Sequence, residues 1–387
     1  MSSKKINYSK PLILDIGTNS FRLGWAGDDF PDIIAPCVYV NLTDFLFTSD
    51  VIDGLEDIFF NKESEHKNLF GYEALKYQNI LRIHEFKKEG NYNVLAKFFH
   101  YFYQKLEIPE EFQFKQPIII LSPFFMSELE KNKLIDLFFN DFLVPSIFFL
   151  SKSQAILSTL QRTSGVVINL GESNTYISTI FRGFSNLMAR DLFPISGKDL
   201  TDYFLNMILM NKTSTSANYL DYWIAKEIKE KLSTCVLNPE EELRRIRDGL
   251  TIYNRVVTLP DGSNLEINLE RFMLTEPLFN PNLIHIDYIS LGEAVAKVIK
   301  TWERENWEEL LSNIILSGGA SLISGLDKRL ELEISNYFSE KIKDKIKVLA
   351  PSGRENMAWI GASILYSQDT LTKGWQTNPK LEISDNI

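Results

Sequence analysis

The feature that most constrains the fold of this chain is an internal repeat. The stretch LILDIGTNSFRLGW at residues 12–25 can be set beside VVINLGESNTYIST at residues 166–179. Each copy runs from apolar residues to one polar residue, then through a glycine and polar residues into a second half-apolar stretch. Each copy therefore predicts a strand, a glycine turn and a second strand. We interpret the pair as a duplication; the alternative is two unrelated hairpins, because Asp-x-Gly is common at turns.

The glycine turns predict binding sites for an anion. Gly17 and Gly171 carry no Cβ, so backbone N–H groups can converge in each turn. Two such turns can hold an oligophosphate from two sides. A third glycine signal, NIILSGGASLISGL at residues 313–326, ends an apolar run in Gly318 and Gly319, which Ala320 follows. Glycine backbone without side chains lets a ligand approach closely, so this segment is predicted to contact a nucleoside.

The rest of the chain predicts a mixed α/β protein. Short apolar runs such as QPIIIL, SIFFL, GVVINL, NIILSGG and IKVLA alternate with stretches of helical period such as SELEKNKLIDLFFNDFL and IAKEIKEKLSTC. Two regions differ. Residues 38–70 are rich in Asp, Glu, Asn and Phe without periodicity, which predicts a small insertion. Residues 200–285 predict a mainly helical region with a polar loop at 211–218 and a hairpin that turns at PDG.

Composition excludes several classes of protein. A formal charge of −10 and a pI near 5.2 argue against direct nucleic-acid binding. Two cysteines, Cys37 and Cys235, indicate a reducing compartment rather than a disulfide scaffold. No apolar stretch follows the first lysines, so we expect no signal peptide, and the apolar runs are too short to cross a bilayer. The four histidines lack the spacing of zinc ligands.

A series of motifs resembles the actin family over nearly the whole chain. GWAGDDFP follows the first glycine turn, and LSKSQAILS, GKDLTDYF, IKEKL, LPDG, ERF, ILSGG and IKVLAPSGRENMAWIGASIL come after it in the family's order. The resemblance implies an α/β, actin-like duplicated ATPase fold, with two lobes and four subdomains around a nucleotide cleft. Sugar kinases and heat-shock chaperones share the duplicated fold but not these strings.

The resemblance also implies where the four subdomains begin and end. Subdomain 1 would comprise residues 1–36, 86–160 and 356–387, and subdomain 2, the divergent insertion, residues 37–85. Subdomain 3 would comprise residues 161–195 and 286–355, and subdomain 4 residues 196–285.

By resemblance, the cofactors are ATP or ADP with Mg²⁺ or Ca²⁺. The metal ion would be held through water by Asp15 and Asn169. Gln154 would position the attacking water, and Tyr176 stands where the family has a histidine that assists it. The remaining nucleotide-binding positions are Gly17, Thr18, Asn19, Arg22, Gly171, Glu172, Ser173, Lys226, Lys229, Glu230, Gly318, Gly319 and Ala320.

Some of these positions depart from the family's pattern. Asn169 replaces an acid and brings no charge to a metal-bound water, and Tyr176 is a poor proton acceptor near neutral pH. Arg22 replaces a lysine and keeps its charge in a planar fork. Asn19 replaces a glycine, and we expect the turn to survive because Asn tolerates left-handed backbone. Glu355 replaces a lysine near the adenine.

The sequence supports three functional hypotheses. The first is an actin-related, ATP-binding protein of the cytoskeleton or of a multi-subunit complex, with weak or absent hydrolysis. We expect such a protein in the cytoplasm with protein partners, namely other actin-like subunits or actin-binding proteins, without direct nucleic-acid binding or membrane insertion. The second is a filament-forming actin-like ATPase. The third is a small-molecule kinase of the same superfamily, for which Asp199 is the candidate general base.

Overall fold

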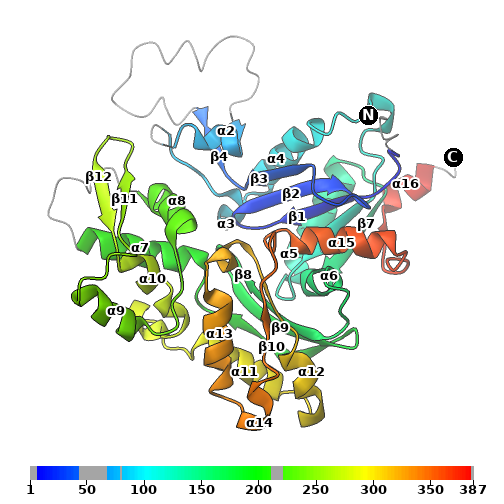
Figure 1. Ribbon diagram of the computed structural model, residues 1–387. Helices are drawn as coiled ribbons and strands as arrows, with labels where there is room; N and C mark the ends of the chain where they lie inside the picture. Colours follow the sequence, from blue (N-terminus) through cyan, green and yellow to red (C-terminus); the bar gives the residue numbers. More distant parts are fainter. Residues whose placement is uncertain (1–6, 43–67, 79–80, 211–220, 385–387) are drawn as a thin grey trace, which may run out of the picture. The chain divides into compact units, whose positions relative to one another are not determined.

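The structure, a computed structural model, describes residues 7–42, 68–78, 81–210 and 221–384 of the 387-residue chain (Figure 1). The chain divides into two compact units. The first comprises Met1–Thr159 and Ala358–Ile387, and the second comprises Leu160–Met357. Each unit contains a large sheet with both parallel and antiparallel strands.

The sheet of the first unit has six strands in the order β15-β7-β6-β1-β2-β3. The strands β1, β6 and β7 run parallel, while β2 is antiparallel to β1 and to β3. The elements of this unit are β1 (Leu12–Ile16), β2 (Ser20–Trp25), β3 (Ile33–Pro36), β4 (Tyr39–Asn41), β5 (Asn68–Phe70), α2 (Tyr72–Leu75), α3 (Phe86–Glu89), α4 (Tyr92–Gln104), η2 (Glu110–Phe112), β6 (Ile118–Ser122), α5 (Glu128–Asp136), η3 (Leu137–Asp141), β7 (Ser146–Ser151), α6 (Lys152–Ser158), α15 (Met357–Ser367), β15 (Gln376–Thr377) and α16 (Pro379–Ser384).

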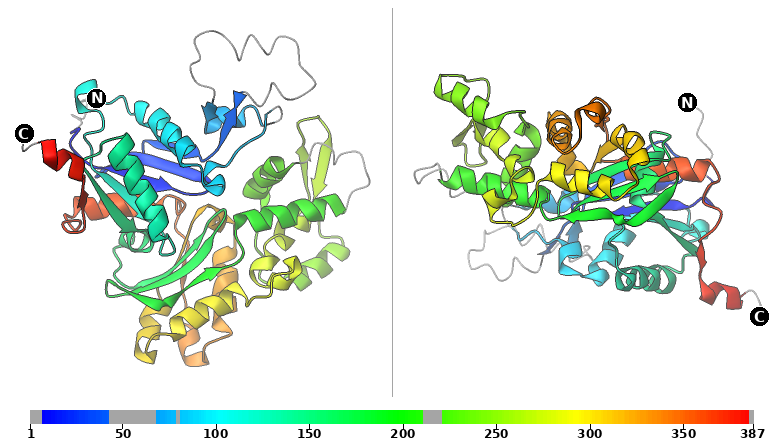
Figure 2. Two further views of the ribbon diagram at one scale, coloured as in Figure 1. Left: turned by 180° about the vertical axis from the view of Figure 1, so that it is seen from behind. Right: turned by 90° about the horizontal axis from the view of Figure 1, so that it is seen from below.

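The sheet of the second unit has five strands in the order β10-β9-β8-β13-β14. The helices α11 and α12 pack against strands of this sheet, and α13 packs beside α11 (Figures 1 and 2). The elements of this unit are β8 (Gly165–Leu170), β9 (Thr175–Phe181), β10 (Phe184–Phe193), α7 (Gly197–Met210), α8 (Tyr222–Leu232), α9 (Pro239–Arg247), β11 (Arg255–Thr258), β12 (Asn264–Ile267), α10 (Glu270–Met273), η5 (Glu276–Leu278), η6 (Pro281–Ile284), α11 (Leu291–Lys300), η7 (Arg304–Asn306), α12 (Trp307–Leu311), β13 (Ile314–Ser317), η8 (Gly319–Leu322), α13 (Leu326–Ser335), α14 (Glu340–Lys343) and β14 (Val348–Leu349).

The two sheets repeat one topology, which confirms the expected duplication. In the first unit the order β3-β2-β1-β6-β7 has the same directions as β10-β9-β8-β13-β14 in the second. In each sheet an antiparallel meander of three strands is followed by two strands parallel to the first. The β1–β2 and β8–β9 hairpins therefore occupy equivalent places in the two sheets. The turn of each hairpin follows a buried central strand, β1 or β8.

Buried apolar side chains fix both hairpins in their sheets. In the first unit, Phe21 of β2 packs its ring edge-to-face on Phe98 of α4, with ring centroids 5.1 Å apart. Phe98 in turn lies against Phe102 one helical turn on, at 4.7 Å. In the second unit, Val166 and Ile168 of β8 are fully buried in the hydrophobic core. Large apolar burial of this kind is the main stabilising term in folding, so both turns sit on rigid supports.

The predicted strands and the PDG hairpin are present, and the helical stretches have some local differences. Residues 128–136 are α-helical, but Leu137–Asp141 form a π-helical turn that leads to Leu143 with φ +52°. The paired strands β4 and β5 lie at the two ends of the predicted insertion, and its residues 43–67 lie outside the described part of the chain. The polar loop at 211–218 also lies outside it. The four subdomain boundaries stay a prediction.

No helix within the described residues is both long and apolar enough to cross a membrane.

Candidate functional site

The two glycine turns have the same local geometry. The Gly17 amide donates to the Ser20 carbonyl at 2.9 Å, and the Gly171 amide donates to the Asn174 carbonyl at 3.0 Å. A Cβ at either glycine would lie 2.8 Å from that same carbonyl oxygen. Both turns therefore require glycine because the backbone approaches itself too closely for a side chain.

The expected reason for tolerating Asn19 was wrong. Asn19 does not appear among the described residues with positive φ, so the turn forms without left-handed backbone. Its carbonyl accepts a hydrogen bond from the Cys37 amide at 2.9 Å, which ties the turn to the chain beyond β3. Thr18, next to it, is half-buried.

The first turn gathers positive charge around the buried Asp15. Arg22 lies directly opposite Asp15 in the β1–β2 register, and its Nη1 donates to Asp15 Oδ2 at 3.2 Å. The Lys152 ammonium lies 2.5 Å from the other oxygen, Oδ1. Lys87 Nζ donates to the Ile16 carbonyl at 2.7 Å. Two cations thus contact the carboxylate at the end of β1, and a third contacts the next backbone carbonyl.

The electrostatics of this cluster keep Asp15 ionised. Burial alone would raise the pKa of Asp15, but the charges of Lys152 and Arg22 outweigh it and hold that pKa below its ordinary value. Burial lowers the pKa of Lys87, and the nearby Lys152 charge lowers it further. An anion at this turn would relieve the repulsion among the cations.

Lys87 and Lys152 were missed by the sequence analysis. Lys152 follows β7 directly and begins α6, inside the motif that was examined for Gln154. Because β1, β6 and β7 are parallel, their carboxyl ends share one edge of the sheet, where ligands commonly bind. The lysine after SIFFLS was therefore a usable signal. Lys87 comes from a short helix, α3, that no local pattern connects to this edge.

The second turn carries neutral groups at the equivalent places. Asn169 and Tyr176 are direct partners in the β8–β9 register, as Asp15 and Arg22 are in β1–β2. The Asn169 amide donates to Ser317 Oγ at 3.3 Å, and Tyr176 is buried. The structure therefore places the two departures from the family's pattern side by side. Neither residue brings a charge to this turn near neutral pH.

The second turn also meets the helices expected to contact a nucleoside. Lys226 of α8 forms an ion pair with Glu172 at 3.1 Å, and the Tyr222 hydroxyl donates to the same carboxylate oxygen at 2.5 Å. Burial raises the pKa of Glu172, but the Lys226 and Lys229 charges outweigh it and lower the pKa below its ordinary value. Glu172 is therefore a fixed, charged group with acceptor capacity left for ribose hydroxyls.

Lys229 and Glu230 have different surroundings. The Lys229 ammonium is buried and donates to the Gly197 carbonyl and to Thr201 Oγ1, both at 2.7 Å. It thereby fixes the start of α7, whose Gly197 amide donates to the Gly171 carbonyl at 2.8 Å. Glu230 is exposed. Lys229 thus supports the second turn through α7 in this structure.

The segment around Gly318 and Gly319, which follows β13 and was expected to contact a nucleoside, is closely packed. Gly318 has φ +91°, and a Cβ there would lie 2.4 Å from the Leu170 carbonyl oxygen. Gly319 has nothing within 4 Å of its Cβ position. Arg354, another residue missed in the sequence, fixes this segment: its Nη2 donates to the Ser321 carbonyl at 2.7 Å, and its own carbonyl accepts from Ser317 Oγ at 3.1 Å. Gly319 therefore offers open backbone on a rigid base.

Four further residues bear on a ligand. The Ser173 hydroxyl of the second turn is buried and has no hydrogen-bond partner among the described residues. Ala320 lies within the same cluster, 3.0 Å from the Cβ position of Gly197. Gln154 on α6 is exposed, and Glu355 has a buried Oε2 without a hydrogen-bond partner in the described part. The side chains of Ser173, Gln154 and Glu355 can form hydrogen bonds to a bound molecule.

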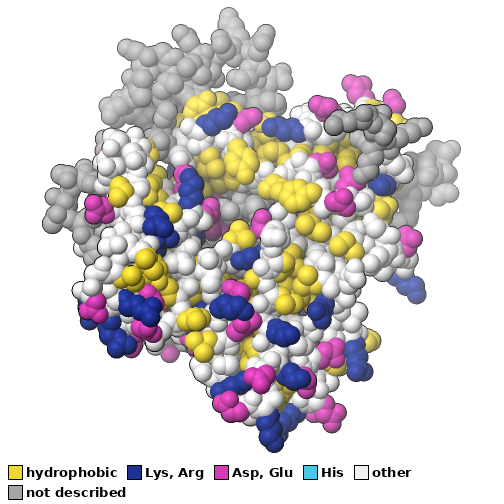
Figure 3. Space-filling view, viewed as in Figure 1, with side chains coloured by type: hydrophobic (Ala, Val, Ile, Leu, Met, Phe, Trp, Pro, Cys, Tyr) yellow, Lys and Arg dark blue, Asp and Glu magenta, His cyan; other side chains and the backbone are white. Residues whose placement is uncertain are grey.

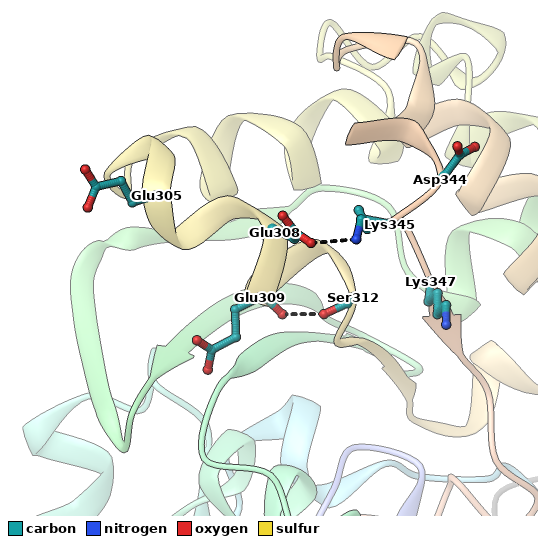
Figure 4. A pocket seen from close by; sticks show the side chains of 7 residues that line it. All are labelled: Glu305, Glu308, Glu309, Ser312, Asp344, Lys345 and Lys347. Atoms are coloured by element: carbon teal, nitrogen blue, oxygen red, sulfur yellow. Dashed lines mark hydrogen bonds and ion pairs between the residues drawn. The ribbon is translucent and has the colours of Figure 1, made fainter. Parts of the chain in front are cut away.

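A surface hollow of about 800 Å³ lies on the second unit (Figure 4). Two of its charged groups form an ion pair, in which Lys345 Nζ lies 2.7 Å from Glu308 Oε1. None of the predicted site residues lines it. Figure 3 shows positively and negatively charged side chains interspersed over the face that it displays. The candidate functional groups of each unit are therefore those around its own glycine turn.

The comparison with known proteins agrees with the duplicated sheets and the glycine turns. The family model described as Actin matches residues 6–380. This match covers both sheets, both glycine turns and the segment after β13, and it confirms the expected actin-like fold. The chain belongs to the actin family.

Proposed function

We propose that this chain is an actin-related protein that binds ATP or ADP and hydrolyses ATP slowly or not at all. It would act in the cytoskeleton or as a subunit of a multi-subunit complex in the cytoplasm, with other actin-like subunits or actin-binding proteins as partners. The observation that carries the proposal is the contrast between the two turns. Both keep their glycine geometry, but the second has lost its charge at Asn169 and Tyr176.

Nucleotide binding is supported by the groups that each unit presents. In the first unit, Arg22, Lys87 and Lys152 supply positive charge for phosphates. In the second unit, Glu172 supplies acceptors for the ribose, and Gly319 supplies open backbone. Amide groups in the glycine turns add donors without a Cβ in the way.

Slow hydrolysis is supported by the pair in the second turn. A tyrosine hydroxyl has an ordinary pKa near 10, so it is a poor acceptor for the proton of an attacking water. Asn169 can hydrogen-bond to water but brings no negative charge. Gln154 remains to orient the water, and orientation without a proton acceptor gives a weak catalyst.

The kinase hypothesis is weakened by the surroundings of Asp199. Its Oδ2 accepts from the Ser196 amide at 2.7 Å and from the Ser196 hydroxyl at 2.6 Å. This arrangement is a cap for the first turn of α7, which accounts for the carboxylate without catalysis. The filament-forming ATPase remains the alternative function.

Changing Arg22 to Met is expected to weaken nucleotide binding about tenfold or more, because a charge-assisted hydrogen bond to phosphate is lost. Unmodified protein should release ATP or ADP on denaturation, and added nucleotide should raise its melting temperature. Isothermal titration of nucleotide-free protein measures the affinity. The matched control is Arg82→Met, an exposed arginine of the same unit. Absence of both nucleotide and thermal shift in the unmodified protein would refute nucleotide binding.

The chain alone is expected not to form long actin-type filaments in Mg²⁺ and ordinary salt. A head-to-tail filament needs two complementary patches. The insertion at residues 38–70 resembles no family segment, and its acidic residues should repel an identical neighbour unless cations screen them. Sedimentation and electron microscopy over a range of salt test this, and two-stranded filaments of pure protein would contradict it. The charges concerned lie outside the described residues and are Asp44, Asp50, Asp53, Glu56, Asp57, Glu63 and Glu65 against Lys62 and Lys67.

A further inference from the structure

Lys152 presents its ammonium directly to the Asp15 carboxylate. The Lys152 Nζ lies 2.5 Å from Asp15 Oδ1, and the two side chains are 13% and 6% exposed. The Arg22 guanidinium takes the other carboxylate oxygen at 3.2 Å. Each oxygen of Asp15 therefore lies close to a cationic side chain of the same unit.

These contacts do not fit a divalent cation at the first turn. A metal-bound water would have to share a carboxylate oxygen with the ammonium of Lys152 or the guanidinium of Arg22. The metal ion would also lie among like charges, which disfavours binding strongly where water is excluded. The equivalent turn of the second unit offers neutral Asn169, whose amide donates to Ser317. Within the described ranges, no group of three or more His, Cys, Asp or Glu could hold a metal ion.

We infer that Lys152 takes the place of the divalent cation, so that this chain binds the phosphates of ATP or ADP without a metal ion. The inference rests on the nucleotide binding proposed above and changes its cofactor. Divalent cations such as Mg²⁺ prefer charged oxygen ligands. In the first turn the Asp15 carboxylate faces cationic side chains, and in the second turn Asn169 brings no charge. The positive charge then comes from the protein itself.

The geometry of the cluster suits direct phosphate binding. An ammonium carries three donors and acts as a point charge, and one carboxylate oxygen engages one of those donors. Lys87, fixed on the Ile16 carbonyl, and Arg22 add two further cations beside the same turn. Glu130 lies 4.0 Å from Lys87 Nζ and is half-exposed, so it offsets the cluster weakly. The excess positive charge is what an oligophosphate would neutralise.

The first experiment uses the unmodified, nucleotide-free protein. ATP and ADP are titrated by calorimetry in buffer with EDTA and in buffer with Mg²⁺, at equal ionic strength. We expect dissociation constants that agree within about threefold, a difference below 1 kcal/mol. Metal analysis of the complex formed in Mg²⁺ buffer is expected to find no stoichiometric Mg²⁺.

Variants at position 152 then assign the effect to the ammonium. Lys152→Met is expected to weaken ATP binding in EDTA by about tenfold or more, since a charge-assisted contact is lost. Lys152→Arg keeps a cation and should retain metal-independent binding. The matched control is Lys131→Met: Lys131 is another lysine of the first unit that forms a close ion pair, at 2.6 Å with Glu128 on α5. Circular dichroism establishes that each variant is folded.

The possible results separate this inference from the proposed function. Binding that requires Mg²⁺ overturns the inference and leaves nucleotide binding intact. Equal binding in both buffers, weakened by Lys152→Met but not by Lys131→Met, supports it. Equal binding that Lys152→Met leaves unchanged overturns the role of Lys152. Absence of binding in both buffers overturns the proposed function itself, and the inference with it.

Discussion

Replacing Asn169 by Asp together with Tyr176 by His is expected to raise the rate of phosphate release from bound ATP by about 10²-fold or more. The histidine supplies a proton acceptor with an ordinary pKa near 6.5, whereas the ordinary pKa of a tyrosine hydroxyl is near 10. A positioned acid or base commonly contributes about 10²- to 10⁴-fold to a rate. Because the two residues are register partners on β8 and β9, the acid and the histidine would lie next to each other.

Single-turnover phosphate release from preloaded protein measures this effect. The matched control is Tyr337→His, a tyrosine of the same unit whose hydroxyl donates to Glu293 at 3.3 Å. That control should leave the rate of the unmodified protein unchanged. The single changes at 169 and 176 show which position limits the rate. If the unmodified protein already hydrolyses ATP as fast as the double variant, these two positions do not limit hydrolysis.

Changing Gly318 to Ala is expected to lower the free energy of unfolding by about 3 kcal/mol or more. Two effects combine at this position. A non-glycine residue at φ +91° costs on the order of 1–3 kcal/mol, and forcing a methyl group into a packed site commonly costs about as much again. The added carbon would lie 2.4 Å from the Leu170 carbonyl oxygen, on backbone of the central strand β8 that cannot move aside.

The neighbouring glycine is the control for this prediction. Gly319→Ala meets nothing within 4 Å, and Gly319 does not have positive φ, so we expect it to change stability little. Thermal unfolding of nucleotide-free protein measures both variants. For a unit of this size, about 3 kcal/mol corresponds to a fall of about 6–12 °C in melting temperature. Equal melting temperatures for the two variants would show that the segment can rearrange.

The internal repeat accounts for most of what could be predicted from the sequence. A hairpin is set by contacts between near neighbours, so the apolar runs on either side of Gly17 and Gly171 were sufficient to predict both turns. The same alignment placed Asn169 and Tyr176 at the positions of Asp15 and Arg22. The loss of charge in the second turn was therefore visible before the fold was known. The family resemblance added the roles of these positions but not their contacts.

The tertiary structure decided which charges surround the first turn. Lys152 is far from Asp15 in the sequence and meets it through the order and register of β1, β6 and β7. Lys87 comes from α3 and contacts the neighbouring Ile16 carbonyl. The tertiary structure also showed that Lys229 is buried against the start of α7 and that Arg354 fixes the segment around Gly318 and Gly319. A long side chain can extend in many directions, so its partner depends on which elements fold beside it. Local sequence patterns carry no record of such contacts, whereas they fully describe a turn that closes on itself.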